Sequence, residues 1–96
     1  MLESAFQAKL IKEIEEALPG CVIMKNDANY RQGVPDILIL FKRRWGMLEV
    51  KKSPTANQQP NQKYWVKRLD EMGYSSFVFP ENKDAVLREL VGYLNV

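Results

Sequence analysis

The stretch that decides the fold is GVPDILILF at residues 33–41, followed by WGMLEVKK at residues 45–52. Both segments are rich in Ile, Leu and Val, and only Lys42-Arg43-Arg44 separates them. Such a connection is too short for a crossover between parallel strands, whereas a turn between antiparallel strands needs only a few residues. The sequence therefore predicts a β-hairpin at the centre of the fold.

The register of this hairpin decides which polar side chains meet. A two-residue turn at Lys42-Arg43 sets Asp36 directly opposite Glu49, with Cβ atoms roughly 5 Å apart. A longer turn ending at Gly46 sets Asp36 opposite Lys51 instead and leaves Glu49 diagonal to Asp36. Glu49 and Lys51 are two residues apart and point to the same strand face. In both registers Asp36, Glu49 and Lys51 share one neighbourhood.

Two acids among apolar strand residues need a physical reason. Opposed like charges are destabilising, and an unpaired buried carboxylate is costly. A hard divalent cation such as Mg²⁺ or Mn²⁺ resolves both problems, because it takes oxygen ligands from one or two carboxylates. Such an ion supports phosphodiester cleavage, in which Lys51 orients or deprotonates the attacking water or neutralises transition-state charge. The alternative interpretation is an ordinary cross-strand ion pair between an acid and Lys51.

Four motifs in order resemble the PD-(D/E)XK nuclease superfamily and, more narrowly, its stand-alone virus-type replication-repair nuclease (VRR-NUC) domains. The motifs are Glu3 in an early helix, the Gly-x-Pro-Asp at residues 33–36, the Glu-x-Lys at residues 49–51, and Gln62 near the next helix start. The resemblance covers nearly the whole chain. It implies one α/β domain over residues 1–96, with a restriction-endonuclease-like αβββαβα core and a mixed sheet flanked by helices.

The resemblance also implies an activity, an Mg²⁺- or Mn²⁺-dependent DNA endonuclease. Asp36, Glu49 and the Val50 carbonyl would hold the metal, and Lys51 would be the catalytic lysine, with Glu3 and Gln62 in support. Stand-alone members are similar to enzymes that cut branched DNA such as Holliday junctions, which implies a symmetric homodimer, and a phage-like origin is implied too. The alternatives are a nuclease acting on ordinary duplex or flap DNA and a non-catalytic nucleic-acid-binding module of the same fold.

Two of the supporting residues also have an ordinary structural interpretation. Glu3 in a first helical turn can simply favour the helix dipole. Gln62 can act as a capping-box residue that reaches back to the amide of Gln59, with Pro60 at the first helical position.

Composition narrows the chemistry. The 96 residues contain no histidine, which excludes Ser-His-Asp catalysis and histidine-bearing zinc sites. A composition of 46% hydrophobic and 27% charged residues is that of one globular domain, and no apolar run approaches the roughly 20 residues that cross a bilayer. One cysteine, Cys21, permits no internal disulfide, and the N-terminal segment does not resemble a secretion signal. We expect an intracellular protein, in a bacterial cytoplasm or associated with the nucleoid, with no membrane partner.

The net charge of +2 conceals a basic middle, because residues 25–68 contain ten basic residues and three acidic ones. A basic segment that encloses a carboxylate site suits a polyanion such as DNA, although a solvated mixed-charge surface is the alternative. The candidate DNA contacts are Arg31, Lys42, Arg43, Arg44, Lys52, Lys63 and Lys67.

Periodicity completes the expected elements. Apolar residues recur every four positions over residues 2–18, which predicts an amphipathic helix that stops at Pro19-Gly20. A short strand follows at 21–25, and the hairpin leads to a helix from Pro60 to Gly73. The expected buried stripe of that helix is Trp65, Leu69 and Met72. A strand at 74–79, parallel to the hairpin through a right-handed crossover, and a helix over 86–94 close the chain.

Overall fold

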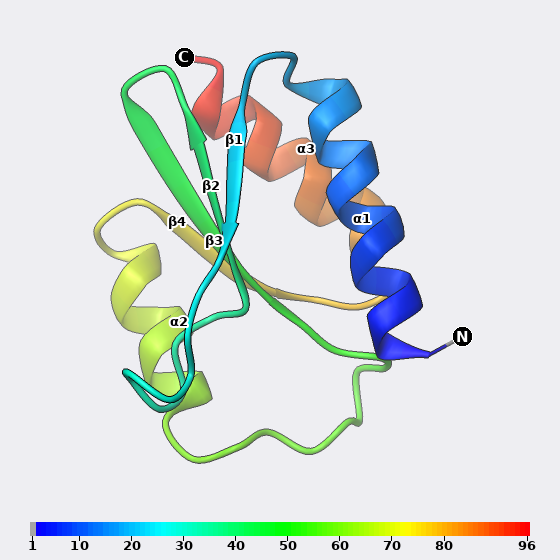
Figure 1. Cartoon of the computed structure of the whole chain (residues 1–96), viewed down its shortest axis with the longest axis vertical. Helices are drawn as coiled ribbons and strands as arrows, with labels where there is room; N and C mark the ends of the chain where they lie inside the picture. Colours follow the sequence, from blue (N-terminus) through cyan, green and yellow to red (C-terminus); the bar gives the residue numbers. More distant parts are fainter. Residues whose placement is uncertain (1) are drawn as a thin grey trace.

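The computed structural model describes residues 2–96 and has the predicted α/β order (Figure 1). Its elements are α1 (Glu3–Ala17), β1 (Val22–Lys25), β2 (Ile37–Phe41), β3 (Arg44–Val50), α2 (Gln62–Asp70), β4 (Tyr74–Val78) and α3 (Lys83–Leu94). A four-stranded mixed sheet flanked by helices is compatible with a restriction-endonuclease-like core.

No helix within residues 2–96 has the length and apolar character needed to cross a membrane.

The sheet has the strand order β1-β2-β3-β4. β2 pairs antiparallel with both β1 and β3, and β4 joins β3 in parallel after the crossover through α2. The ladder between β2 and β3 runs from Phe41 opposite Arg44 to Ile37 opposite Leu48. The two-residue turn at Lys42-Arg43 is therefore confirmed, and the longer turn ending at Gly46 is wrong.

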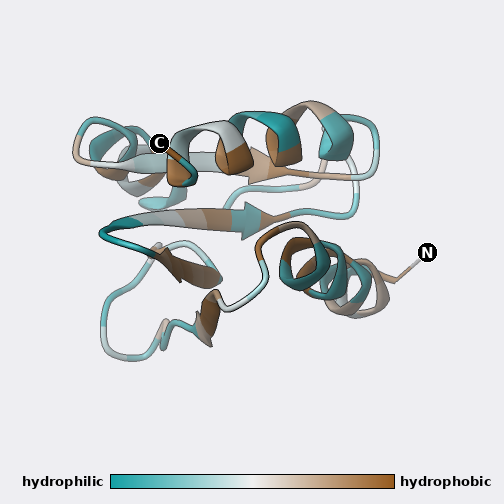
Figure 2. Cartoon of the chain, turned by 90° about the horizontal axis from the view of Figure 1, so that it is seen from above, coloured by the Kyte–Doolittle hydropathy of each residue, from teal (hydrophilic) through white to brown (hydrophobic). Residues whose placement is uncertain are grey.

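The main core lies between the sheet and the helix pair α1 and α3. Phe6, Leu10 and Ile14 of α1 are buried there with Leu90 and Leu94 of α3. Their helical spacing brings one apolar face of each helix onto the sheet, and Figure 2 shows the brown segments of these helices turned toward the interior. Leu2, predicted to belong to this stripe, is 76% exposed because it precedes the helix.

The opposite face of the sheet is covered only in part, by the nine-residue helix α2. Val66 is its single buried residue, whereas Trp65 and Leu69 are half-buried and Met72 is 53% exposed. The predicted buried stripe was therefore wrong. In α2, Val66 is buried, whereas Trp65 and Leu69 border an open pocket.

The start of α2 also differs from the prediction. The helix begins at Gln62, and its N-cap residue is Asn61 in a left-handed conformation with φ of 73°. Pro60 therefore lies before the helix instead of at its first position. The residue that ends up as the N-cap makes a long-range contact, because Gly33, itself at φ of 89°, packs against the Asn61 backbone. A Cβ atom on Gly33 would lie 2.7 Å from the Asn61 carbonyl carbon.

This contact predicts that Gly33→Ala destabilises the fold. An alanine in a left-handed conformation that also overlaps Asn61 costs roughly 1–3 kcal/mol of unfolding free energy. Urea unfolding followed by circular dichroism measures the loss. The matched control is Gly92→Ala in α3, whose added Cβ meets nothing within 4 Å and should stabilise the helix by roughly 0.5–1 kcal/mol. Equal unfolding midpoints for the two variants would contradict this account.

Candidate active site

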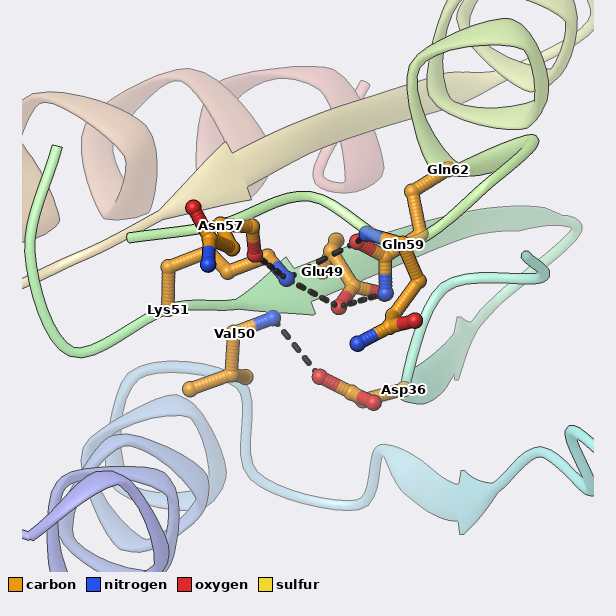
Figure 3. Close-up of polar contacts among 7 residues, drawn as sticks. All are labelled: Asp36, Glu49, Val50, Lys51, Asn57, Gln59 and Gln62. Atoms are coloured by element: carbon orange, nitrogen blue, oxygen red, sulfur yellow. Dashed lines mark hydrogen bonds and ion pairs between the residues drawn. The ribbon is translucent and has the colours of Figure 1, made fainter. Parts of the chain in front are cut away.

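The candidate site lies where β2 begins and β3 ends. Asp36 immediately precedes β2, Glu49 and Val50 are the last residues of β3, and Lys51 follows the strand. Because Ile37 pairs with Leu48, the same register places Asp36 beside Glu49. Figure 3 shows Glu49, Lys51 and Gln62 converging, with Asp36 below them on the side of β2.

Glu49 is the most constrained group of the site. It is 2% exposed, and its Oε2 accepts a hydrogen bond from Gln62 Nε2 at 2.9 Å. The Lys51 ammonium lies 3.7 Å from the same oxygen. The second oxygen, Oε1, is buried and has no hydrogen-bond partner among residues 2–96. A buried polar atom without a partner is costly and calls for an explanation.

Burial is also the main reason that the pKa of Glu49 rises from an ordinary 4.5 to about 8. The next largest cause is the negative charge of Asp36, which opposes a second negative charge beside it. Lys51 lowers the pKa but does not offset these two effects. Without a cation, ionising Glu49 beside the negatively charged Asp36 is therefore energetically unfavourable.

Asp36 is oriented by the backbone of β3. Its Oδ2 accepts a hydrogen bond from the Val50 N–H at 2.8 Å. The N–H and C=O of one strand residue point to the same edge of the strand, and the Lys51 N–H instead donates to Val78 of β4 at 2.8 Å. The Val50 N–H thus faces Asp36, and strand geometry predicts that its carbonyl points to the same edge.

Lys51 is held on every side by acceptors. Its Nζ donates to the Asn57 carbonyl at 3.0 Å and to Gln62 Oε1 at 2.8 Å, and Glu49 Oε2 completes the set at 3.7 Å. Two of the three donors of this group are used in hydrogen bonds, and the contact with Glu49 is an ion pair. These contacts fix the position of the Lys51 side chain beside Glu49.

Gln62 connects the loop before α2 to the carboxylate of β3. Its Oε1 accepts from the Gln59 N–H at 2.8 Å, which is the predicted contact, although the N-cap of α2 is Asn61 and not Gln59. Its Nε2 donates to Glu49. The first residue of α2 therefore fixes the loop before the helix and the carboxylate of β3 at once.

An open groove of about 1080 Å³ joins these groups, and we call it the carboxylate groove. All five residues predicted as catalytic line it, and so does Lys52. Glu3 enters from the first turn of α1 and is exposed, yet its charge adds slightly to the rise in the Glu49 pKa. The residues predicted as catalytic are Glu3, Asp36, Glu49, Lys51 and Gln62.

The basic candidates do not all gather at this groove. The hairpin tip lies beside the C-terminus in Figure 1, at the opposite end of β3, and five strand residues place Arg44 about 17 Å from Glu49. Lys42 donates to Asn95 at 3.3 Å, and the Arg44 guanidinium lies 4.7 Å from the Tyr93 ring centroid. Arg43 at this tip is exposed.

The remaining basic candidates lie on α2 or against it. Lys63 and Lys67 are exposed on α2, and the guanidinium of Arg31 lies 5.2 Å from the Trp65 ring centroid.

The sequence analysis missed two residues that help to form the hollows on this side of the sheet. Asn57 acts through its backbone carbonyl, which no residue type signals, and Trp65 was assigned to the core because it falls at helical spacing.

Comparison with models of known protein families finds no match, and no curated protein matches the chain. Within residues 2–96, no three side chains of His, Cys, Asp or Glu group closely enough to hold a metal by themselves. A metal at this site would therefore rest on two carboxylates, a backbone carbonyl and non-protein ligands.

The raised pKa of Glu49 predicts an unusual dependence of stability on pH. Between pH 4.5 and about 8 the folded protein binds a proton that the unfolded chain releases. The free energy of unfolding of the metal-free protein should therefore fall as the pH rises through this window. Glu49→Gln removes the charge and should be more stable than the original at pH 8, by roughly 1–3 kcal/mol.

Urea unfolding in EDTA at several pH values measures this difference. Glu16→Gln is the matched control, since Glu16 is exposed on α1. If Glu49→Gln and Glu16→Gln show the same pH profile, Glu49 is not the strained group described here.

Proposed function

We propose that this chain is a divalent-metal-dependent DNA endonuclease that hydrolyses phosphodiester bonds. The observation that carries the proposal is the burial of the Glu49 carboxylate beside that of Asp36, with no hydrogen bond from residues 2–96 donated to Glu49 Oε1. A structural ion pair would use its oxygens, whereas a metal ligand leaves one free for the cation. The four ordered motifs that resemble the VRR-NUC domains support the same activity.

The residues present fit Mg²⁺ or Mn²⁺. Asp36, Glu49 and the Val50 carbonyl offer hard oxygen ligands, the kind that Mg²⁺ takes together with water and substrate phosphate. When bound, such an ion stabilises charge on the phosphate and lowers the pKa of water. It would also let both carboxylates ionise, which the protein alone opposes.

The other polar residues act through the network already described. Lys51 supplies a fixed positive charge toward the scissile phosphate, and an oriented cation of this kind stabilises negative charge in the transition state. Gln62 holds Lys51 and Glu49 in their relative positions. Glu3 also lines the carboxylate groove and would orient a ligand water.

For the substrate, we propose branched DNA such as a Holliday junction. Cutting two strands of a symmetric junction requires two sites, so we also propose a symmetric homodimer. Lys52 in the groove and Lys63 and Lys67 on α2 would contact the phosphate backbone near the site. Lys42, Arg43 and Arg44 would meet a more distant arm of the DNA.

The activity predicts a clear pattern among variants. Asp36→Ala, Glu49→Ala and Lys51→Ala should each lower the rate of nicking by at least about 100-fold, because each removes charge from the transition-state environment. Binding of the same DNA without metal should change little. Gel assays with junction, flap, linear duplex and single-stranded DNA measure both properties.

Arg88→Ala is the control for these variants, because it removes an exposed cation of α3 that does not line the groove. Wild-type protein that nicks none of these substrates with Mg²⁺ or Mn²⁺ would defeat the enzyme proposal. Binding without any nicking would favour the non-catalytic module instead.

Metal binding should also stabilise the fold. A ligand at 100 times its Kd adds about 2.7 kcal/mol, which corresponds to roughly 10–20 °C in Tm for a domain of this size. Thermal unfolding with increasing MnCl₂ measures the effect against NaCl at equal ionic strength. Asp36→Asn and Glu49→Gln should abolish this rise in Tm. A wild-type Tm that does not change with MnCl₂ would refute the proposed metal site.

A further inference from the structure

A second cavity, which we call the aromatic pocket, opens on the α2 side of the sheet. Its volume is about 730 Å³, and its walls include Tyr30, Arg31, Val34, Met47, Trp65 and Leu69. The loop over residues 26–36 and α2 lie side by side and form its two sides (Figure 1). It is a mainly apolar hollow that no segment of residues 2–96 fills.

The aromatic pocket adjoins the carboxylate groove along three separate pieces of chain. On β3, Met47 and Glu49 are two residues apart on the same face, a separation of about 7 Å. On α2, Trp65 lies three residues after Gln62, which makes them neighbours on the helix surface. In the loop, Val34 is two residues from Asp36. The aromatic pocket and the carboxylate groove therefore lie next to each other on one surface of the protein.

The side chains around the pocket suit a flat, electron-rich ring beside a negative charge. Tyr30 is 83% exposed, and Trp65 is half-buried. The Arg31 guanidinium lies 5.9 Å from the Tyr30 ring centroid and 5.2 Å from that of Trp65. Aromatic faces and arginine planes are the groups on which unpaired bases stack.

Two polar residues at the rim are held in place by the protein. Asn26 Nδ2 donates to the Pro35 carbonyl at 2.9 Å and lies 3.5 Å from Met47 Sδ. Asp27 Oδ1 accepts from the Asn29 N–H at 2.8 Å. The rim therefore presents fixed polar groups that can meet the edge of a heterocycle.

We infer that the aromatic pocket receives one unpaired nucleobase of the DNA strand whose neighbouring phosphate lies in the carboxylate groove. This inference rests on the proposed function and narrows its substrate to DNA with an unstacked nucleotide next to the scissile bond. An intact duplex or a fully paired junction would have to unpair and unstack a base first, whereas a flap or a bulge already offers one. A pocket for a single base then favours DNA that carries an unpaired nucleotide at the branch point.

The experiment compares two flap DNAs that are identical except for one position at the branch point. One carries an unpaired adenine there, and the other carries an abasic site. Binding is measured by fluorescence anisotropy with the full chain in EDTA. Wild-type protein should bind the adenine-containing DNA about ten-fold more tightly, which is the loss expected for one base–aromatic stack.

Trp65→Ala should bind both DNAs equally, and Trp65→Phe should restore part of the preference. Tyr30→Ala is the second variant, because this exposed side chain can be removed without disturbing the core. Met72→Ala is the control, an exposed residue just beyond α2 that lies outside the pocket and should keep the full preference.

Equal binding of both DNAs by the wild type, or a ten-fold preference kept by both pocket variants, would overturn the inference. A dimer that dissociates on Trp65→Ala, together with equal binding of the two DNAs by the wild type, would assign the pocket to a contact between two copies and would overturn it as well. Nicking activity is scored separately. Base preference without any nicking would refute the proposed function alone, and nicking without base preference would refute this inference alone.

Discussion

The structure depends on one strained interaction, the burial of the Glu49 carboxylate beside Asp36. Burial and like charge both oppose ionisation, and the Lys51 ammonium offsets only part of that cost. The surrounding contacts nevertheless hold the arrangement in place, since the hairpin register brings the two acids together and Gln62 fixes Glu49 and Lys51. This contact costs stability in the metal-free protein, and the cation that we propose would relieve that cost.

The sheet separates the core from the site. On one face, α1 and α3 bury a continuous apolar layer that supplies the main core of the domain. On the other face, the short helix α2 buries only Val66 and leaves both hollows open at its sides. Because α2 begins with Gln62 and carries Trp65 one turn later, its placement shapes the carboxylate groove and the aromatic pocket together.

The sequence predicted what local rules control, and it failed where distant contacts decide. The short connector left two registers open, and both of them bring Asp36, Glu49 and Lys51 into one neighbourhood, so this neighbourhood could be predicted. The structure selects the register with the two-residue turn. The start of α2 could not be predicted. Its N-cap residue, Asn61, adopts a left-handed conformation and packs against Gly33, a residue far away in sequence. Trp65 has the spacing of a core residue, and only the partial cover of the sheet by α2 reveals that it borders an open pocket.

The most direct test of a cation between these acids is a crystal structure of the protein soaked in MnCl₂, with anomalous data collected near the manganese edge. The account predicts an anomalous peak bonded to Asp36 and to Glu49 Oε1, at roughly 2.0–2.3 Å from each oxygen. It would be contradicted by a map without an anomalous peak at this position at millimolar Mn²⁺.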